Sequence, residues 1–485
     1  MSLDDLKERA AGSGFVFEAI KDDTGVKGIS LSFHQGTGLD HFYVLNDDYE
    51  KFRSFITDVF SHSHMKVCFD IRDVISLGIE LKGYCDVMAV STMMAEENHV
   101  RAVNSVIKEC DIEEFERSRK RLSSHVKACK TAKIDLSKHS LIDVVPSKLM
   151  MSLYRLKNEM TWELYGKLPE HELDRFKNVI YGRLASLFKI EKSRVSVNPV
   201  DYVEGEVGDR RFIEDLKRRS YDGFVDVRYG TVFKKTGRVH PKKSFWNCMN
   251  IPNTYVRRSI VSGWDGGVIA RMDLNAADYR CIMASTDDEE LNMLYSEDMD
   301  FHDRTAELLF GLGRSNQTRR RVVKDITYMM LYGGSDEVLM KKTGLSREML
   351  EGTLKRLDEY VAPLVEFKEM LFEKSMVAGY VENPAGLRMK LAGDEHMGKV
   401  LAWYAQSCAN EVFFDGVAAV LRELESSLAL FTVHDELVID VHPDEISKLN
   451  ELKEAMELGS SALFGVRMRS SLDVGPNYWE MKRWS

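Results

Sequence analysis

Residues 268–280 read VIARMDLNAADYR and join a short apolar run to a helix-forming stretch. The run VIARM predicts a buried strand that ends on Asp273. The following AADYR favours a helix. A carboxylate at a strand end, directly before a helix, lies at a sheet edge where a hard cation can reach it. Taken alone the pattern is weak evidence, because an Asp in this place is more often a helix N-cap.

Residues 319–334, RRRVVKDITYMMLYGG, predict a helix with one polar stripe. The stripe contains four side chains spaced four residues apart: Arg320, Lys324, Tyr328 and Tyr332. On a helix they share one slowly winding face. The two cations suit the phosphates of a nucleoside triphosphate, and the two tyrosines suit its sugar, its base and the templating base. Gly333 and Gly334 end the helix or let another backbone come close. For this segment alone, an amphipathic surface helix is the simpler interpretation.

Residues 428–441, LALFTVHDELVIDV, carry His434, Asp435 and Glu436 between two apolar runs that are typical of strands. The pattern predicts a hairpin with carboxylates at its tip. A solvated turn also commonly contains Asp. Because burying unpaired charge is costly, three polar residues between two buried strands favour a functional interpretation.

Together, the three segments predict a site for phosphoryl transfer. Asp273 and Asp435 come from different segments and could bridge two Mg²⁺ ions about 3.5–4 Å apart, one activating the attacking oxygen and one the leaving oxygen. Mg²⁺ favours sparse carboxylate ligation completed by phosphates and water, and Mn²⁺ accepts the same ligands. The cations of the 319–334 helix would neutralise charge on the transferring phosphate and on the leaving pyrophosphate.

The charge of the chain is unevenly distributed. A net charge of -10 is unusual for a protein that binds phosphates. However, residues 209–243 hold eleven basic side chains against five acidic ones, and residues 117–138 hold eight against Asp135 alone. We interpret 209–243 as a nucleic-acid contact because of the motifs that follow it, and 117–138 as a solvated face.

Length and composition indicate the broad class of the protein. A chain of 485 residues with 44% hydrophobic and 30% charged residues predicts two or three globular domains. The N-terminus resembles no secretory signal, and no apolar run approaches the ~18 residues of a membrane span. Seven cysteines without a CxxC pair indicate reduced thiols. We therefore expect a cytoplasmic protein with no membrane partner.

The hydrophobic pattern along the chain predicts an α/β protein. Residues 14–46 alternate as three strands of a meander, and KVCFD and YCDVMAVSTMM suggest further strands, with a helix at 72–77 between them. A long helix is expected over 149–168, and this first α/β domain ends near residue 168. Residues 169–230 are predicted to be largely helical. From Val268 onward, strand and long-helix patterns alternate to the C-terminus.

These segments strongly resemble the polymerase motifs of family A DNA polymerases, the DNA polymerase I family. DLNAADYR is similar to motif A, R-R-x-x-K-x-x-x-Y-x-x-x-Y-G to motif B, and VHDE to motif C. Further similar segments lie between and before them: TGR at 236–238 with NIP at 250–252, DFHDRTAELLFG at 300–311, GYVENPAGLR at 379–388 and AQSCANE at 405–411. The resemblance extends from Thr236 to the C-terminus.

The resemblance implies a role for each matching residue. The metal ligands would be Asp273, Asp435 and the carbonyl of Leu274. Glu436 would be an auxiliary carboxylate, and Lys324 the general acid for pyrophosphate. The nucleotide-binding residues would be Arg320, His302, Lys324, Tyr328, Tyr332 and Asp278. The primer-template contacts would be Arg238, Gln406, His434 and Gly333.

The resemblance also implies an α+β polymerase fold that has the form of a right hand. Its expected parts are a short thumb at 169–235, a palm at 236–300 and 400–485, and fingers at 301–399. The sequence departs from the family at three places. Asp278 replaces the usual Glu, which walls off the sugar 2′ position and bonds to Tyr332. Tyr328 replaces a common Phe and implies good dideoxynucleotide acceptance. The thumb is short, which predicts weak unaided processivity.

The first domain, residues 1–168, more weakly resembles the 3′–5′ exonuclease of the same family, an α/β domain of ribonuclease H-like fold. FVFEAI at 15–20 lies where a metal-binding D-x-E belongs, but Ile20 cannot bind metal. KVCFDIRD at 66–73 offers Asp70 and Asp73, whereas YRLKN at 154–158 has Asn158 in place of a carboxylate. A two-metal nuclease needs its full set of acids. We therefore expect a degenerate exonuclease.

The resemblance implies a DNA-directed DNA polymerase that extends a primer 3′ end with dNTPs and does not proofread. Its expected partners are primer-template DNA and dNTPs, with a processivity factor or a helicase–primase as further candidates. The small size suggests a phage-like replicase acting in the bacterial cytoplasm, or a gap-filling enzyme. Two alternatives remain: a single-subunit RNA polymerase, which the acid at 278 and Tyr328 oppose, and a catalytically silent DNA-binding replication subunit, which would not need Asp273, Asp435, Lys324 and Tyr328 together.

Overall fold

The computed structural model comprises two compact units, Met1–Lys177 and Asn178–Ser485. In the first unit it describes residues 3–22, 25–35, 38–45, 49–62, 66–68 and 84–86. In the second it describes residues 181–199, 207–229, 236–241, 245–286, 288–289, 305–306, 317–333, 336–360 and 362–484. No helix within these ranges is long and apolar enough to cross a membrane.

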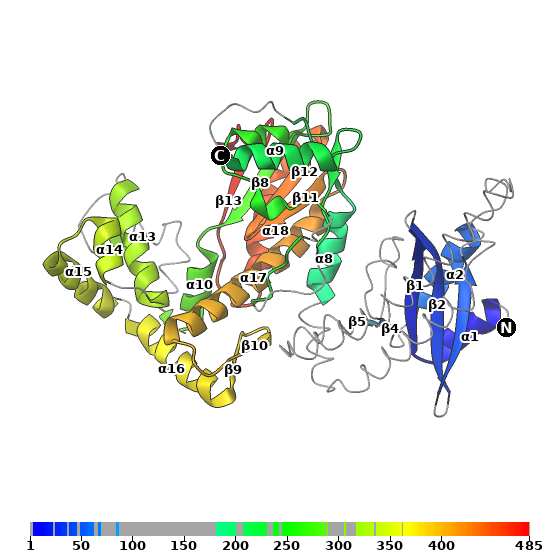
Figure 1. Cartoon of the computed structure of the whole chain (residues 1–485), viewed down its shortest axis with the longest axis horizontal. Coiled ribbons are helices and arrows are strands. Elements are labelled where there is room, and N and C mark those ends of the chain that lie inside the picture. The colour runs from blue at the N-terminus through cyan, green and yellow to red at the C-terminus, as the bar shows by residue number, and fades with distance from the viewer. Residues whose placement is uncertain are drawn as a thin grey trace. The chain divides into compact units, whose positions relative to one another are not determined.

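The first unit is built on a five-stranded mixed sheet (Figure 1). Its elements are α1 (Leu3–Gly12), β1 (Phe15–Asp22), β2 (Gly25–Gln35), β3 (Gly38–Leu45), α2 (Tyr49–Ser61), β4 (Lys66–Cys68) and β5 (Tyr84–Asp86). The strand order is β3-β2-β1-β4-β5. The β1–β2 and β2–β3 pairs are antiparallel, whereas β4 and β5 continue parallel to β1. The predicted meander is therefore confirmed, but the two helices were not expected from the sequence.

Aromatic side chains form the core between this sheet and α2. Phe60 of α2 packs edge-on against Phe17 and Phe15 of β1, with ring centroids 4.7 and 5.7 Å apart. Ile20 is also buried in this strand. Several predictions lie outside the described residues: the helices at 72–77 and 149–168, the basic run 117–138, and Asp70, Asp73, Tyr154 and Asn158.

The second unit opens with two helices and a small two-stranded sheet. These elements are α8 (Tyr181–Glu191), β6 (Arg194–Ser196), α9 (Val207–Arg219) and β7 (Phe224–Asp226). Strands β6 and β7 pair antiparallel. The prediction that 169–230 is largely helical holds for α8 and α9 but missed the two strands. Each strand is only three residues long, too short to show a reliable period-2 pattern.

The main sheet of the second unit has five strands, and all of its pairs are antiparallel. They are β8 (Val268–Leu274), β11 (Leu428–Val433), β12 (Glu436–Val441), β13 (Ser470–Gly475) and β14 (Lys482–Arg483), in the order β11-β12-β8-β13-β14. The predicted strand before Asp273 and the predicted hairpin at 428–441 are confirmed.

Two long helices, α17 (Met397–Glu423) and α18 (Leu449–Ser461), pack side by side along one face of this sheet (Figure 1). The short helix η5 (Pro443–Lys448) leads into α18. The two helices meet at glycines. A Cβ on Gly416 would lie 2.8 Å from the carbonyl oxygen of Met456, and one on Gly459 would lie 2.7 Å from the Cβ of Ala419. Backbone therefore packs on backbone at this crossing, which larger residues would force apart.

The remaining elements of the second unit connect and flank the sheet. They are η3 (Cys248–Asn250), η4 (Tyr255–Ser259), α10 (Ala277–Ala284), α13 (Gln317–Tyr332), α14 (Asp336–Thr343), α15 (Arg347–Tyr360), α16 (Ala362–Ala378), β9 (Tyr380–Glu382) and β10 (Arg388–Lys390). Helix α13, which was predicted over 319–334, packs against α14 and α17. The whole is a mixed α/β arrangement, as the sequence predicted.

Candidate active site

Strand pairing brings Asp273 and the 434–436 hairpin tip together. In the sheet register, Asp273 of β8 lies opposite Glu436 of β12. The turn between β11 and β12 contains only His434 and Asp435, and His434 has a left-handed φ of 58°. The backbone N–H of Leu274 donates to the carbonyl oxygen of Asp435 over 3.2 Å. The two acids predicted from separate segments therefore lie at one edge of the same sheet.

The electrostatics of Asp273 reflect this proximity. Burial, together with the charges of Asp435 and Glu436, raises the pKa of its carboxyl group to about 7. Arg271 opposes the shift. Neighbouring carboxylates that repel one another in a partly buried place would be stabilised by a divalent cation.

The donor set fits Mg²⁺ better than a metal with a closed protein cage. Within the described ranges, no group of three or more His, Cys, Asp and Glu side chains could hold a metal ion by itself. Asp273 and Asp435 supply hard carboxylate oxygens, and Leu274 follows directly in the strand. Mg²⁺ commonly uses one or two protein carboxylates and completes its shell with water and phosphate oxygens.

Glu436 faces other protein groups. The hydroxyl of Tyr478 donates to its carboxylate, and Arg271 Nε lies 3.6 Å from it. Arg271 also donates to Asp473 over 2.6 Å. Burial raises the pKa of Glu436, and the bond from Tyr478 and the charge of Arg271 oppose that rise. Sequence reasoning missed Tyr478 and Asp473, which follow the last of the recognised motifs.

Asp278, in the first turn of α10, lies among several of the predicted site residues. Burial raises the pKa of its carboxyl group to about 6, with Arg238 lowering it and Asp435 raising it. The charge of Asp278 in turn raises the pKa of both Tyr328 and Tyr332, second only to burial. Asp278 therefore interacts electrostatically with Arg238, with Asp435 and with the two tyrosines of α13.

Three side chains of the stripe predicted on α13 are described, and they lie next to one another along the helix. Lys324 is exposed, and its Nζ lies 5.6 Å from the centroid of the Tyr328 ring. The Tyr328 ring contacts Tyr332 at 5.6 Å and Tyr279 of α10 at 5.0 Å between centroids. The three rings therefore form a continuous aromatic cluster near Asp278. Arg320 belongs to the same helix, whereas His302 lies outside the described residues.

One expected contact is absent. The hydroxyl of Tyr332 is buried and has no hydrogen-bond partner among the residues that the structure describes. The predicted bond to Asp278 is therefore not made. The physical reason is that the side chain of Asp is one methylene shorter than that of Glu, so the two groups interact through charge rather than direct contact. Gly333 ends the helix with a φ of 90°, its N–H donating to the carbonyl of Met329 over 2.8 Å.

Arg238 follows a tightly held loop. The carbonyl oxygen of Gly237 accepts from Arg183 Nη1 over 2.8 Å and from Asn410 Nδ2 over 3.1 Å. Arg183 is buried and also pairs with Glu411. Gly237 has a φ of 73°, and a Cβ there would lie 2.8 Å from Arg183 Nη1. The loop therefore needs glycine, and its position is determined by helices α8 and α17.

Two further residues predicted to contact the primer-template lie on different elements. Gln406 is half-buried on α17, and His434 is exposed at the hairpin tip. The basic run 209–243 is partly neutralised within α9, where Arg210 pairs with Glu214 and Arg219 with Asp215. Part of the positive charge of the run is therefore engaged in ion pairs within the protein.

A sequence model described as DNA polymerase family A matches residues 183–480, more than half of the chain. The chain belongs to DNA polymerase family A. The match begins at Arg183 and includes all three motif segments, together with Asn410, Glu411 and Tyr478.

Several family A relatives are similar at low identity. DNA polymerase I of Streptococcus pneumoniae is 24% identical over 283 residues, which cover 54% of this chain and 32% of the relative. The thermostable DNA polymerase I of Thermus filiformis is 22% identical over 409 residues, covering 76% and 48%. That of Thermus aquaticus is 26% identical over 254 residues, covering 48% and 30%. The matched part thus spans between about a third and a half of these relatives.

The fold is shared with a solved family member. The POL domain of Pol1 from M. smegmatis, in complex with DNA primer-template and dNTP, superposes with a TM-score of 0.70. The match covers 98% of both chains at 13% sequence identity. At that identity the similarity establishes the fold of this family A chain and leaves its chemistry to be argued from the site.

Proposed function

We propose that the protein is a template-directed DNA polymerase that adds deoxynucleotides to a primer 3′ end. The observation that carries the proposal is the meeting of Asp273 and Asp435 at one sheet edge, with Asp278 linking Asp435 to the tyrosines of α13. Such an edge, with an aromatic and cationic helix beside it, suits a nucleoside triphosphate. Family membership supports the same conclusion.

In this proposal, Asp273, Asp435 and the Leu274 carbonyl hold two Mg²⁺ ions. Those ions would activate the primer hydroxyl and neutralise charge on the phosphates. Lys324 is exposed on α13, where it can donate a proton to the leaving pyrophosphate. Arg320 and His302 are assigned to the triphosphate by resemblance. Glu436, bonded to Tyr478 and close to Arg271, would keep the hairpin tip in place.

The nucleotide pocket would be formed by Asp278, Tyr328 and Tyr332. The tyrosine rings present aromatic faces suited to a base and sugar, because stacking is tolerant of base identity. Asp278 would limit space at the sugar 2′ carbon. Arg238, Gln406, His434 and Gly333 are assigned to the primer-template, with Arg238 held by the Gly237 loop.

The proposed domain boundaries are those expected from the sequence. Residues 236–300 and 400–485 would form the palm, 301–399 the fingers and 169–235 a short thumb. Residues 1–168 would be a degenerate exonuclease. The order β3-β2-β1-β4-β5, with β4 and β5 parallel to β1, is compatible with the expected ribonuclease H-like fold. The buried Ile20 supports the loss of one metal ligand. The short thumb suggests a separate processivity partner.

A primer-extension assay tests the proposal. We expect Mg²⁺-dependent extension with dNTPs that follows the template sequence. The assay with NTPs in place of dNTPs tests the single-subunit RNA polymerase alternative, which the acid at 278 and Tyr328 oppose. Template-dependent binding without incorporation of either substrate, at any Mg²⁺ or Mn²⁺ concentration, would instead favour a silent DNA-binding subunit.

A further inference from the structure

The two faces of the main sheet carry different chemistry. Asp273, Glu436 and Ser471 lie opposite one another in adjacent strands and share one face. The alternate residues Met272 and Leu274 are fully buried on the other face, toward α17 and α18. Ser470, the first residue of β13, pairs with Leu274 in the register and is also buried. A group that holds Ser470 therefore acts on β13, the strand that pairs with the Asp273 strand β8.

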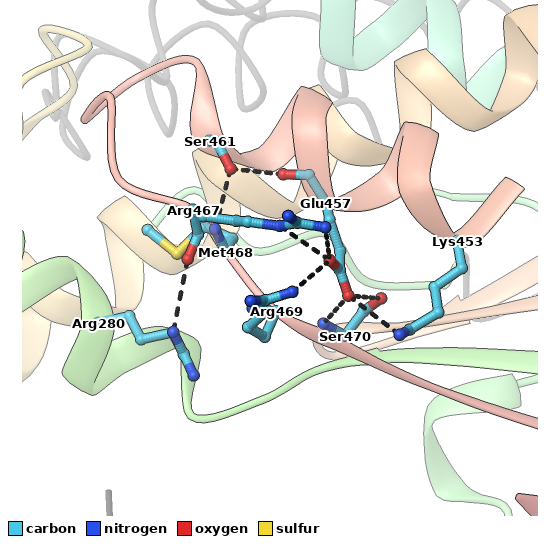
Figure 2. A network of polar contacts seen from close by, with 8 residues as sticks. All are labelled: Arg280, Lys453, Glu457, Ser461, Arg467, Met468, Arg469 and Ser470. Carbon is cyan, nitrogen blue, oxygen red and sulfur yellow. Dashed lines mark hydrogen bonds and ion pairs between the residues drawn. The ribbon is translucent and has the colours of Figure 1, made fainter. Parts of the chain in front are cut away.

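Glu457 of α18 is such a group (Figure 2). Its side chain is 2% exposed. Its carboxylate accepts from the backbone N–H of Ser470 over 2.9 Å and from the Ser470 hydroxyl over 3.3 Å. Three cations surround it at N–O distances of 3.4, 3.1 and 3.6 Å: Lys453, Arg467 and Arg469. Burial opposes ionisation of Glu457, but the bond from Ser470 and the charges of Lys453 and Arg467 outweigh it and lower its pKa.

The segment that Glu457 organises also holds the turn that follows Asp273. The N–H of Asn275 donates to the carbonyl of Arg469 over 2.8 Å. Arg280 of α10 donates from Nε to the carbonyl of Asn275 over 2.9 Å and from Nη1 to the carbonyl of Arg467 over 3.4 Å. Figure 2 shows the Arg280 side chain directed at Arg467. The connection from Glu457 to the turn thus runs through backbone atoms.

The loop between α18 and β13 is closed by a further pair of bonds. The Ser461 hydroxyl donates to the carbonyl of Glu457 and accepts from the N–H of Met468 over 2.9 Å. Residues 467–470 are therefore held at both ends, by Ser461 and by Glu457. Glu457 also pairs with the side chains of Arg467 and Arg469, which belong to this segment.

We propose that Glu457 is a positioning residue for Asp273: by anchoring residues 467–470 beneath the sheet, it sets the place of the metal-binding carboxylate and of the 274–276 turn. The inference rests on the proposed function. Groups that orient a metal ligand without touching the metal commonly change metal affinity about 10–100-fold when they are removed. The effect of Glu457 is expected at the lower end, because it acts through Ser470 and the strand pairing.

The test compares Glu457→Gln with a matched control, Glu445→Gln. Glu445 is also a buried glutamate of the same unit, and it accepts backbone N–H groups of Ser426 and Ser427 over 2.7 and 2.9 Å. Those residues precede β11, at the opposite end of the strand from the Asp435 turn. Each substitution removes one buried negative charge and keeps nearly the same side-chain shape. Only Glu457 is connected, through Ser470 and strand pairing, to the segment that carries Asp273.

The first readout is Mn²⁺ binding, measured by electron paramagnetic resonance on the full chain with primer-template, a dideoxy-terminated primer and dNTP. We expect about tenfold weaker binding for Glu457→Gln and wild-type binding for Glu445→Gln, with primer-template affinity unchanged in both. Equal Mn²⁺ affinity in the two variants would overturn the proposal and leave Glu457 a stability residue. If Glu457→Gln does not fold, Ser470→Ala serves as the milder variant. It should weaken Mn²⁺ binding by a smaller factor.

The second readout needs no metal. Hydrogen exchange of peptides covering 268–280 should accelerate in Glu457→Gln and not in Glu445→Gln. Unchanged exchange there would overturn the positioning role even if activity fell. If the proposed function is itself wrong, Asp273→Ala and wild type will bind Mn²⁺ equally. That result differs from failure of the present inference, in which Asp273→Ala loses Mn²⁺ and Glu457→Gln retains it.

Discussion

The two units of this protein each contain a five-stranded sheet, yet among the residues that the structure describes only the second sheet shows acids brought together at a strand end. In the second unit, the register of β8 with β12 and the short turn before β12 bring Asp273 near Asp435. In the first unit, the described part of β1 presents the buried side chains of Phe15, Phe17 and Ile20. The second sheet thus carries the proposed reaction site, whereas the described part of the first sheet carries an apolar core.

The difference shows that the site depends on which side chains occupy the strand ends. A sheet edge offers a place where residues from distant segments meet, but the chemistry needs acids at matching register positions. In the second unit, burial and the neighbouring carboxylates raise the pKa of Asp273. A bound cation would stabilise the ionised carboxylates against their mutual repulsion. The comparison can be tested by changing the acids of each unit in turn and measuring the activity of the whole protein.

The largest expected effect is on the acids of the second sheet. Asp273→Ala or Asp435→Ala should reduce primer extension at least a thousandfold, about 4 kcal/mol of transition-state stabilisation, because each removes a metal ligand. Primer-template affinity should remain nearly unchanged. Single-turnover incorporation and a DNA-binding titration give the two quantities.

A control for these variants lies in the same strand pair. Asp440 of β12 is buried and accepts from Ser262 and from the N–H of Gly263, away from the Asp435 turn. Asp440→Ala should lower stability and leave the chemical rate of the folded fraction within a few-fold. Retention of a tenth of wild-type kcat by Asp273→Ala would show that the carboxylates meet for a structural reason.

The next effect concerns Tyr328, which links the sheet to α13. Tyr328→Phe should lower dideoxynucleotide incorporation about 10–100-fold and spare normal dNTPs, since the hydroxyl would replace the missing 3′-OH through a charge-assisted hydrogen bond of ~1.5–3 kcal/mol. Competition between ddNTP and dNTP on one template measures the ratio. An equal loss for both substrates would mean that the Tyr328 hydroxyl has no such role and that its ring contacts to Tyr279 and Tyr332 matter instead.

A smaller, graded effect is expected at Asp278. Asp278→Glu should raise the dNTP/NTP ratio of kcat/KM, and Asp278→Ala should lower it, by about fivefold at the ~1 kcal/mol end of the range for one methylene. The longer side chain would also reach toward the Tyr332 hydroxyl, which is buried without a partner in the described structure. Matched single-nucleotide incorporations with the three proteins give the ratios. If Asp278→Ala leaves the ratio unchanged, Asp278 is not the sugar gate.

No effect is expected from the first sheet. The protein should not release nucleotides from a mismatched 3′ end with Mg²⁺ or Mn²⁺, because the exonuclease resemblance puts Ile20 and Asn158 at positions where a nuclease needs acids. Asp70→Ala should therefore behave as wild type in a degradation assay with a labelled primer. Metal-dependent release that Asp70→Ala abolishes would show that both sheets carry chemistry, and the contrast between them would fail.

The sequence by itself determined the elements whose signals are local. The alternation over 14–46, the four-residue stripe of α13 and the apolar runs around Asp435 each predict an element correctly, because side-chain period follows backbone geometry. The same local patterns indicated Asp273 and Asp435 as partners. Very short strands such as β6 and β7 escaped, since three residues do not establish a period.

Only the tertiary structure decided how these elements are held. Arg183 and Glu411 pair across 228 residues of sequence to hold the loop before Arg238, and nothing in their local sequence indicates the contact. The same is true of Glu457 beneath Ser470, and of Tyr478 against Glu436. A buried polar contact depends on which helix and strand the core brings together, and that is a property of packing over the whole unit rather than of any one segment.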